Sequence, residues 1–248
     1  TTTVTLLHQL FMSLGYPTGM LSTIVNKINN REVEATHTTP DAIKLNELLA
    51  KMVEAGCTFC FMEVSSHAVV QNRIAGLSFQ GGIFSNITHD HLDFHKSFGE
   101  YLKAKKRFFD ELPSHSFAIT NADDKNGSVM LQNTKASKHT YSLQNMADFK
   151  GRIIESPIDG LHLNLDGNEI WCRLVGRFNA YNLLSVYATA LLLGENKLEV
   201  LTYLSNLNSV EGRFDYIKAE DGTIGIVDYA HTPDALKNVL ETINELRT

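Results

Sequence analysis

The feature that most constrains the fold of this chain is the alternation of short apolar runs with longer helical segments. Nearly uninterrupted apolar runs occur at 58–64, 82–87 and 117–121, and polar side chains stand at the carboxyl end of each. Such runs are typical of strands buried on both faces of a parallel sheet. The pattern predicts an α/β fold with a mostly parallel sheet flanked by helices. We expect those helices at about 4–14, 41–55, 98–112, 179–193, 198–207 and 236–246.

The pattern changes between about 138 and 175, where apolar stretches are shorter and partly alternating. Asp166-Gly167 in this segment is a hairpin turn signal. We expect a small antiparallel subsheet there, and a later strand at 224–228 that leads into the last helix. At the ends of the first two helices, Gly15 and Gly56 are expected to terminate them, and Pro40 and Asp41 to open the second.

Composition excludes several function classes. The 248 residues are 43% hydrophobic and 20% charged, with a net charge of −6 and scattered Lys and Arg, so we expect no nucleic-acid partner. No apolar stretch is long enough to span a bilayer, and no signal peptide is evident. We therefore expect a cytoplasmic monomer without a membrane partner. The chain opens on Thr1 and closes within a helix, so both ends are expected to be cuts in a longer protein.

The three cysteines are an odd number within apolar segments. Cys57 and Cys60 have the two-residue gap of a redox or zinc pair, but no second pair or nearby His completes such a site. Together with Cys172 they are therefore interpreted as buried thiols in a reducing compartment.

Chemistry-bearing side chains gather after two of the predicted strands. Glu63 is a carboxylate within an apolar run, which is costly unless it is paired or bound to a metal. After the next run, His89, Asp90, His91, Asp93 and His95 fall within seven residues. Ligands of open α/β sheets bind at the carboxyl ends of strands. We expect a site there, with a solvated loop as the alternative.

Two chemistries compete for this cluster. The spacing His89-x-His91-x-Asp93 superficially resembles the metal-binding run of metallo-β-lactamase-like hydrolases. In that family a His directly follows the Asp, whereas here Phe94 intervenes and His95 comes one position late. A slip of one residue changes which side chain faces the metal, and the family's wider sandwich pattern is also absent. This interpretation fails on spacing.

The second interpretation accounts for nearly the whole chain. A series of motifs, in order, resembles the central ATP-binding domain of Mur ligases: 62–67 (MEVSSH), 86–93 (NITHDHLD), 101–105 (YLKAK), 121–124 (NADD), 176–182 (GRFNAYN), 212–213 (GR) and 228–234 (DYAHTPD). Each motif alone is weak, but seven in order are a strong signal. The resemblance implies a P-loop-like α/β domain over 1–248, without the family's N-terminal UDP-binding and C-terminal amino-acid-binding domains.

Within the family, these motifs and 38–40 (TTP) are most similar to the branch that adds the third residue, meso-diaminopimelate or L-lysine, to UDP-MurNAc-L-Ala-D-Glu. The resemblance implies an ATP-dependent ligase that forms an amide bond through an acyl phosphate in peptidoglycan precursor synthesis. We favour meso-diaminopimelate as the diamino acid. The domain that selects it is expected to be absent from this chain.

The resemblance also implies Mg²⁺ ligands and a modified lysine. Glu63 and His91 resemble the family's metal ligands, and the hydroxyl of Thr1 is a further candidate. Lys105 matches the family lysine that is carbamylated by CO₂. An ammonium beside Mg²⁺ would repel it, whereas a carbamate supplies negative charge and oxygen. The alternative is a solvated basic face formed with Lys103 and Lys106.

The expected nucleotide-binding residues are spread along the chain. Arg213 resembles a residue that contacts the ATP phosphates, although the acid that follows it in the family is shortened here to Asp215. The glycines and Lys of the family's phosphate loop are not in the chain, so we expect it to be inactive alone. The implied set is Thr1, Thr2, Asn121, Asp124, Asn182, Arg213, Asp228 and His231, with Asn179 as a weaker candidate because Asn often caps helices.

The implied catalytic residues are Lys105, His91 and Arg213. Positions matching those that hold UDP-MurNAc-dipeptide are Thr38, Thr39, Ser65, Gln71 and Arg73, each of which has a cap or surface role as its alternative. Two other functions stay open. Folylpolyglutamate synthetase-like ligases share the fold and the acyl-phosphate chemistry, but lack the motifs at 63–67 and 90–95 in this form. The second open function is that of a non-catalytic module that binds nucleotide or precursor.

Overall fold

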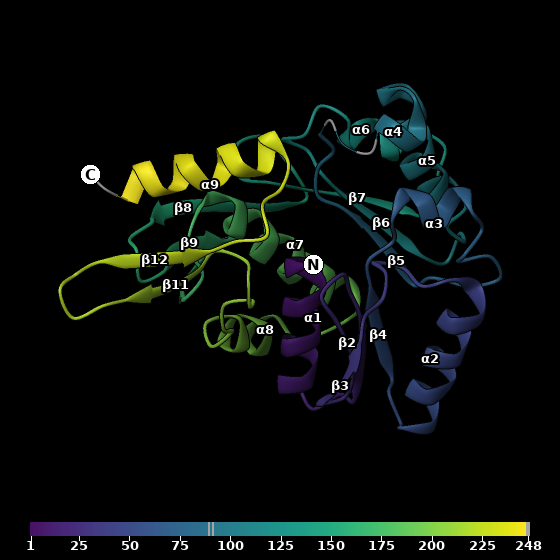
Figure 1. Ribbon diagram of the computed structural model, residues 1–248, viewed down its shortest axis with the longest axis horizontal. Helices are drawn as coiled ribbons and strands as arrows, with labels where there is room; N and C mark the ends of the chain where they lie inside the picture. The colour runs from purple at the N-terminus through teal and green to yellow at the C-terminus, as the bar shows by residue number, and fades with distance from the viewer. Residues whose placement is uncertain (89, 91, 247–248) are drawn as a thin grey trace.

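Two sheets organise the computed structural model, which describes residues 1–88, 90 and 92–246 (Figure 1). The larger sheet has six strands in the order β10-β9-β8-β7-β6-β5. From β5 to β8 neighbouring strands are parallel, and from β8 to β10 they are antiparallel. Its strands are β5 (Gly81–Phe84), β6 (Phe117–Asn121), β7 (Ser137–Ser142), β8 (Phe149–Glu155), β9 (Leu161–Leu165) and β10 (Asn168–Cys172).

The expected antiparallel subsheet is therefore the far end of this larger sheet. The hairpin predicted at Asp166-Gly167 joins β9 to β10, and both residues have positive φ, 46° and 85°, as this turn type requires. The first strand of the segment differs from expectation, because β7 pairs parallel with β6 in the register Phe117↔Ser137. The segment thus extends the α/β sheet without interruption.

The smaller sheet has the order β3-β2-β1-β4, and only its β4 was predicted. β4 runs parallel to β1, with Thr18 opposite Phe59, whereas the other pairs are antiparallel. Short strands that carry polar residues give little periodic signal, which explains why three of them were missed. The strands are β1 (Thr18–Leu21), β2 (Val25–Ile28), β3 (Arg31–Glu34) and β4 (Phe59–Met62).

The main predicted helices are confirmed, and their caps explain their ends. Asp41 accepts hydrogen bonds from the Ile43 and Lys44 amides at 3.0 Å each, and Gly56 follows with φ 77°. The helices are α1 (Thr2–Ser13), α2 (Ala42–Glu54), α3 (Ser66–Val70), α4 (Leu92–His95), α5 (Phe98–Asp110), α6 (Gly127–Met130), α7 (Arg177–Leu192), α8 (Lys197–Leu204) and α9 (Pro233–Leu246).

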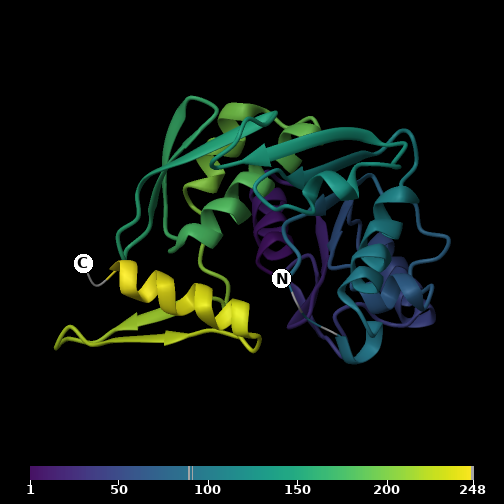
Figure 2. The ribbon, with the colours of Figure 1, turned by 90° about the horizontal axis from the view of Figure 1, so that it is seen from above.

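The main core forms around α7, which lies beside α1 in the middle of the molecule (Figure 2). Ten of its 16 residues are buried, because it packs against α1, α8 and the larger sheet. A helix that is apolar nearly all round is expected to be buried in this way. The beginning of α1 is thereby held at the junction of the two sheets.

The two sheets face each other through β4 and β5. In the described part of the chain each of these strands pairs with one neighbour, β1 and β6 respectively. A groove of about 530 Å³ lies between them and is lined mostly by apolar residues, including Phe59, Phe61 and Ile83. The sheets therefore meet through side chains, without backbone pairing, and their carboxyl ends are close together.

The last elements form a separate layer at one side of the molecule (Figure 1). β11 (Asp215–Lys218) and β12 (Ile224–Val227) form an antiparallel hairpin, and α9 follows. Apolar side chains such as Ile217, Val227 and Leu240 are more than half exposed. Across the described residues, no helix is both long and apolar enough to cross a membrane.

Candidate active site

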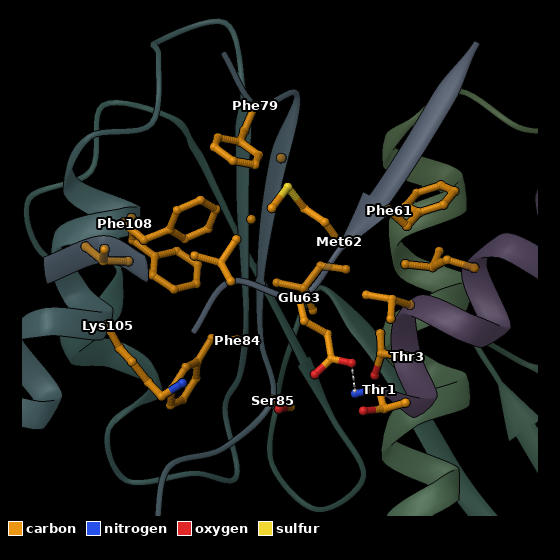
Figure 3. A pocket seen from close by; sticks show the side chains of 18 of the residues that line it. Thr1, Thr3, Phe61, Met62, Glu63, Phe79, Phe84, Ser85, Lys105 and Phe108 are labelled. Atoms are coloured by element: carbon orange, nitrogen blue, oxygen red, sulfur yellow. Dashed lines mark ion pairs between the residues drawn. The ribbon is translucent and has the colours of Figure 1, made fainter. Parts of the chain in front are cut away.

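A pocket of about 280 Å³ lies where β4, β5 and the start of α1 meet (Figure 3). Its polar lining residues follow directly from these elements, because β4 ends before Glu63, β5 ends before Ser85, and α1 begins after Thr1. α5 contributes Lys105 from the opposite wall. Of the polar side chains expected to gather at the carboxyl ends of the strands, Glu63 lines this pocket, whereas the described residues Asp90, Asp93 and His95 do not.

Glu63 is held by the turn between β1 and β2. Its Oε1 accepts a hydrogen bond from the Thr23 amide and its Oε2 one from the Thr23 hydroxyl, both at 3.0 Å. The terminal amine of Thr1 lies 3.2 Å from Oε1. Burial alone would raise the pKa of Glu63, but the hydrogen bonds from Thr23 act in the opposite direction. Thr23 therefore holds this carboxylate in a pocket that also contains Lys105.

Lys105 is a partly buried cation that extends into the same pocket (Figure 3). Its Nζ lies 5.4 Å from the centroid of the Tyr101 ring, one turn earlier on α5. Burial lowers the pKa of Lys105, although Asp90 and Glu63 act in the opposite direction. By contrast, Lys103 on the same helix is exposed and pairs with Glu100. The helix therefore does not form a uniform solvated basic face.

The donor set for a metal is incomplete among the described residues. Glu63 supplies one carboxylate with oxygen ligands suited to Mg²⁺. No cluster of three or more His, Cys, Asp or Glu positioned for a metal exists in 1–88, 90 and 92–246. His91, expected as a metal and catalytic residue, lies outside the described residues.

Another histidine of the 89–95 cluster is buried between neighbouring elements. His95 is 6% exposed, and its Nε2 lies 2.8 Å from the Ser66 hydroxyl at the start of α3. Its ring contacts those of His67, Phe94 and Tyr101. His95 thus joins the segment after β4 to the helix that carries Lys105.

A second cavity, of about 590 Å³, adjoins the first, because Ser85 and Asn86 line both. Most of the expected nucleotide residues line this second cavity. Thr1 instead lines the first pocket. His231 is exposed, and its Nδ1 lies 3.0 Å from the Tyr229 carbonyl. The expected residues in the lining are Thr2, Asn121, Asp124, Asn182, Arg213 and Asp228.

Arg213 lies between the two cavities. Its Nη2 donates to the Thr1 hydroxyl at 3.1 Å, and its guanidinium lies over the Tyr229 ring at 4.9 Å. Its buried Nε has no hydrogen-bond partner within the described structure. A guanidinium with spare donors at this position is suited to an anionic ligand.

The Asn and Asp residues of this cavity also stabilise the fold. Asp228 accepts from the amides of Phe214 and Ala230 at 2.7 Å each, and Phe214 has a φ of 50°. Asp124 accepts from the Ile87 amide at 3.2 Å. Asn182 donates to the Asn179 side chain at 3.1 Å, while buried Asn179, inside the first turn of α7, donates to the Val175 carbonyl at 2.8 Å and is not its cap, which is Gly176.

The expected precursor residues are connected to one another and to Glu63. The Thr39 hydroxyl donates to the Glu63 carbonyl at 2.8 Å, and Arg73 donates to the Thr39 carbonyl at 2.6 Å.

The other expected precursor residues surround this link. Gln71 accepts from Arg73 Nε at 2.9 Å, and the Ser65 hydroxyl accepts the Ala68 amide as the cap of α3. The Thr38 and Thr23 hydroxyls are hydrogen-bonded to each other at 3.1 Å. The structure therefore brings together all of these positions, with a cap role for Ser65.

Two important residues were not assigned from the sequence. Thr23, which holds Glu63, lies in a turn between two strands that gave no signal. Asp123 lines the second cavity and precedes the assigned Asp124. Its place in the 121–124 motif was the only sequence signal for it.

Comparison with known proteins finds relatives along the whole chain. The Mur ligase middle domain family model matches residues 1–190. A UDP-N-acetylmuramoyl-L-alanyl-D-glutamate--2,6-diaminopimelate ligase from Cytophaga hutchinsonii is 65% identical over 247 residues, 100% of this chain and 51% of the relative. A solved structure of a ligase with the same name has a TM-score of 0.83 at 31% identity and covers 98% of this chain and 51% of its own.

A solved folylpolyglutamate synthase from Thermotoga maritima has a TM-score of 0.71 at 12% identity, over 98% of this chain and 63% of its own. That likeness shows a shared fold alone. The chain spans about half the length of the curated relatives it matches. With a family model matched over most of its length and the α/β arrangement of that family, the chain belongs to the Mur ligases.

Proposed function

We propose that this chain is the ATP-binding part of a cytoplasmic ligase that adds meso-diaminopimelate to UDP-MurNAc-L-Ala-D-Glu in peptidoglycan precursor synthesis. One observation carries the proposal: two cavities adjoin at Ser85 and Asn86, one with Glu63 and Lys105, the other with Arg213. This arrangement suits a reaction in which a phosphate passes between a nucleotide and a second substrate. The 65% identical relative bears the name of a ligase for this diamino acid.

The reaction requires two like charges to meet. The terminal carboxylate of the precursor attacks the γ-phosphate of ATP, and ADP leaves with the electrons of the broken P–O bond. The amine of the diamino acid then attacks the acyl phosphate, loses a proton and displaces phosphate. Arg213, whose buried Nε has no partner among the described residues, would neutralise charge on the transferred phosphate. Most of the catalysis would thus come from alignment and charge neutralisation.

Glu63, the Thr1 hydroxyl and His91 are the proposed Mg²⁺ ligands, together with Lys105 once CO₂ has carbamylated it. The metal would supply positive charge beside the phosphates. Carbamylation requires the neutral amine, and the lowered pKa of buried Lys105 favours that form. The carbamate would place a second anionic group opposite Glu63 in the pocket.

The precursor would bind along the network of Thr38, Thr39, Ser65, Gln71 and Arg73. Its support is the direct link from the Thr39 hydroxyl to the Glu63 carbonyl at 2.8 Å, which adjoins the metal pocket. Arg73, partly exposed, is the cation of this group and suits the carboxylates of the dipeptide.

The test is a ligase assay on the full-length protein with matched acceptors. We expect ADP release that depends on both UDP-MurNAc-L-Ala-D-Glu and meso-diaminopimelate, and little release with L-lysine. Preference for L-lysine would correct the amino acid and keep the class. Turnover only with a folate and glutamate would move the protein to the folylpolyglutamate synthetase-like alternative, and turnover with neither would contradict the proposal.

A further inference from the structure

Two consecutive carboxylates at the end of β6 extend toward opposite sides of the larger cavity. Asp124 bonds the Ile87 amide on the β5 side. Asp123 bonds the loop 142–145 that follows β7, and helix α7. We propose that Asp123 is a positioning residue that shapes the nucleotide cavity by holding Gln144 and Tyr181 in its wall. The inference rests on the proposed function, which assigns the nucleotide to this cavity.

The loop 142–145 wraps around the Asp123 carboxylate. Oδ1 accepts from the Ser142 hydroxyl at 2.6 Å and from the Asn145 side-chain amide at 2.7 Å. Oδ2 accepts from the backbone amides of Leu143 at 2.9 Å and Gln144 at 3.1 Å. A loop held by several hydrogen bonds to one charged group has little freedom to move, because charge-assisted bonds are the stronger ones.

The same carboxylate fixes the aromatic part of the wall. The Tyr181 hydroxyl donates to Asp123 Oδ2 at 2.8 Å and accepts from Gln144 Nε2 at 3.0 Å. Both Gln144 and Tyr181 line the cavity. A tyrosine ring beside a side-chain amide suits a planar group with hydrogen-bonding edges, such as a nucleotide base.

Asp123 is ionised in this arrangement. Burial would raise its pKa, but hydrogen bonds from Ser142, Tyr181, Leu143 and Asn145 hold the pKa below its usual range. Each of these partners donates a hydrogen bond to the carboxylate. Asp123→Asn therefore replaces one acceptor oxygen with an NH₂ group that faces donors, and leaves the volume of the side chain nearly unchanged.

In the full-length ligase, Asp123→Asn is expected to raise the KM for ATP about tenfold with little change in kcat, because loss of bonds to a charged group loosens the wall. Asp123→Glu keeps an acceptor carboxylate and should restore part of the affinity. Tyr181→Phe removes a single donor and should raise KM less. A merely structural loss would reduce the active fraction, and hence kcat, without changing KM.

Asp148→Asn is the matched control. Asp148 also bonds β7, through the Thr140 amide and hydroxyl at 2.8 Å each, but it does not line the cavity. Its KM for ATP should stay at the wild-type value. A KM unchanged in both Asp123→Asn and Tyr181→Phe would overturn the inference.

Hydrogen exchange on the same proteins separates this inference from the proposed function. Asp123→Asn should speed exchange of the Leu143 and Gln144 amides, and Asp148→Asn should not. Unchanged exchange of these two amides would refute the role of Asp123 in holding the loop 142–145, even if the ligase turns over ATP as proposed. A wild-type protein that binds no ATP would refute the proposed function, and with it the nucleotide role of Asp123, whatever the loop does.

Discussion

Arg213 and Thr1 are in contact although they are 212 positions apart. Arg213 Nη2 donates to the Thr1 hydroxyl at 3.1 Å, and thereby joins the segment before β11 to the beginning of α1. The guanidinium also lies over the Tyr229 ring, with its Cζ 4.9 Å from the ring centroid. One side chain therefore connects the two cavities, and its geometry depends on a planar group that can bond and stack at once.

Replacing Arg213 with lysine should be nearly as damaging as removing it. Lysine keeps the charge, but it loses the planar group that bonds Thr1 while stacking on Tyr229. We expect kcat/KM of the full-length ligase to fall by about 100-fold or more in Arg213→Lys, on the scale of a lost transition-state donor. Arg152→Lys, on the exposed face of β8, should have wild-type kinetics. Full activity in Arg213→Lys would show that charge alone suffices.

If Lys105 is carbamylated, its replacement by alanine and by glutamate should affect ligase activity to different extents. Lys105→Ala should abolish ligation in the full-length enzyme, whereas Lys105→Glu should retain more activity because it restores an anionic oxygen group near Glu63. Lys103→Ala, on the exposed face of the same helix, is the control and should be active. Steady-state ADP release measures all three. Equal loss in both Lys105 variants, with folding intact, would remove the argument for a carbamate.

We expect Thr23 to affect the Mg²⁺ concentration that the enzyme needs for activity. Its hydroxyl and amide both bond the Glu63 carboxylate at 3.0 Å, so Thr23→Val removes the hydroxyl bonds to Glu63 and Thr38 and keeps the backbone contact. We expect half-maximal activity to need about tenfold more Mg²⁺, in line with the loss of a hydrogen bond to a charged group. Thr23→Ser restores the hydroxyl and should recover the wild-type Mg²⁺ dependence. A Thr23→Val enzyme with an unchanged Mg²⁺ curve would contradict this role.

How far the sequence predicts the fold depends on how strong the local signal is. β4, β5 and β6 were predicted because each lies in a nearly continuous apolar run, and α2 because Asp41 and Gly56 mark its ends. β2 and β3 were missed because polar side chains such as Lys27 and Glu32 interrupt them, and β1 because its four residues begin with Thr18 and Gly19. Their pairing comes from tertiary contacts that no local pattern records.

The site was partly predictable for a similar reason. The rule that ligands bind at strand ends directed attention to Glu63 near the end of the apolar run 58–64, whereas Ser85 was placed inside the predicted strand 82–87, and only the structure shows that it follows β5. Thr23 could not be found in this way, because the strands on either side of it were not recognised. Asp123 stands in a motif, but only the structure shows that its carboxylate bonds the next loop and α7.

His8 makes folding stability dependent on pH at a place remote from both cavities. It is 5% exposed, and its Nε2 lies 3.0 Å from the Asn29 carbonyl. Burial lowers the pKa of His8, although the backbone of Asn29 and Thr18 acts against that shift. The unfolded chain, with an ordinary histidine pKa of about 6.5, therefore binds more protons than the native protein below that pH.

Stability should consequently fall as the pH drops below about 6.5, by at most about 1.4 kcal/mol per pH unit from this one group. His8→Gln keeps a donor for the Asn29 carbonyl but cannot take up a proton, so its free energy of unfolding should fall less between pH 7.5 and 5.5. Urea unfolding at both pH values measures the difference. His37→Gln, at an exposed position, should behave as the wild type. Parallel pH dependence in wild type and His8→Gln would mean that His8 protonates as readily in the native protein as in the unfolded chain.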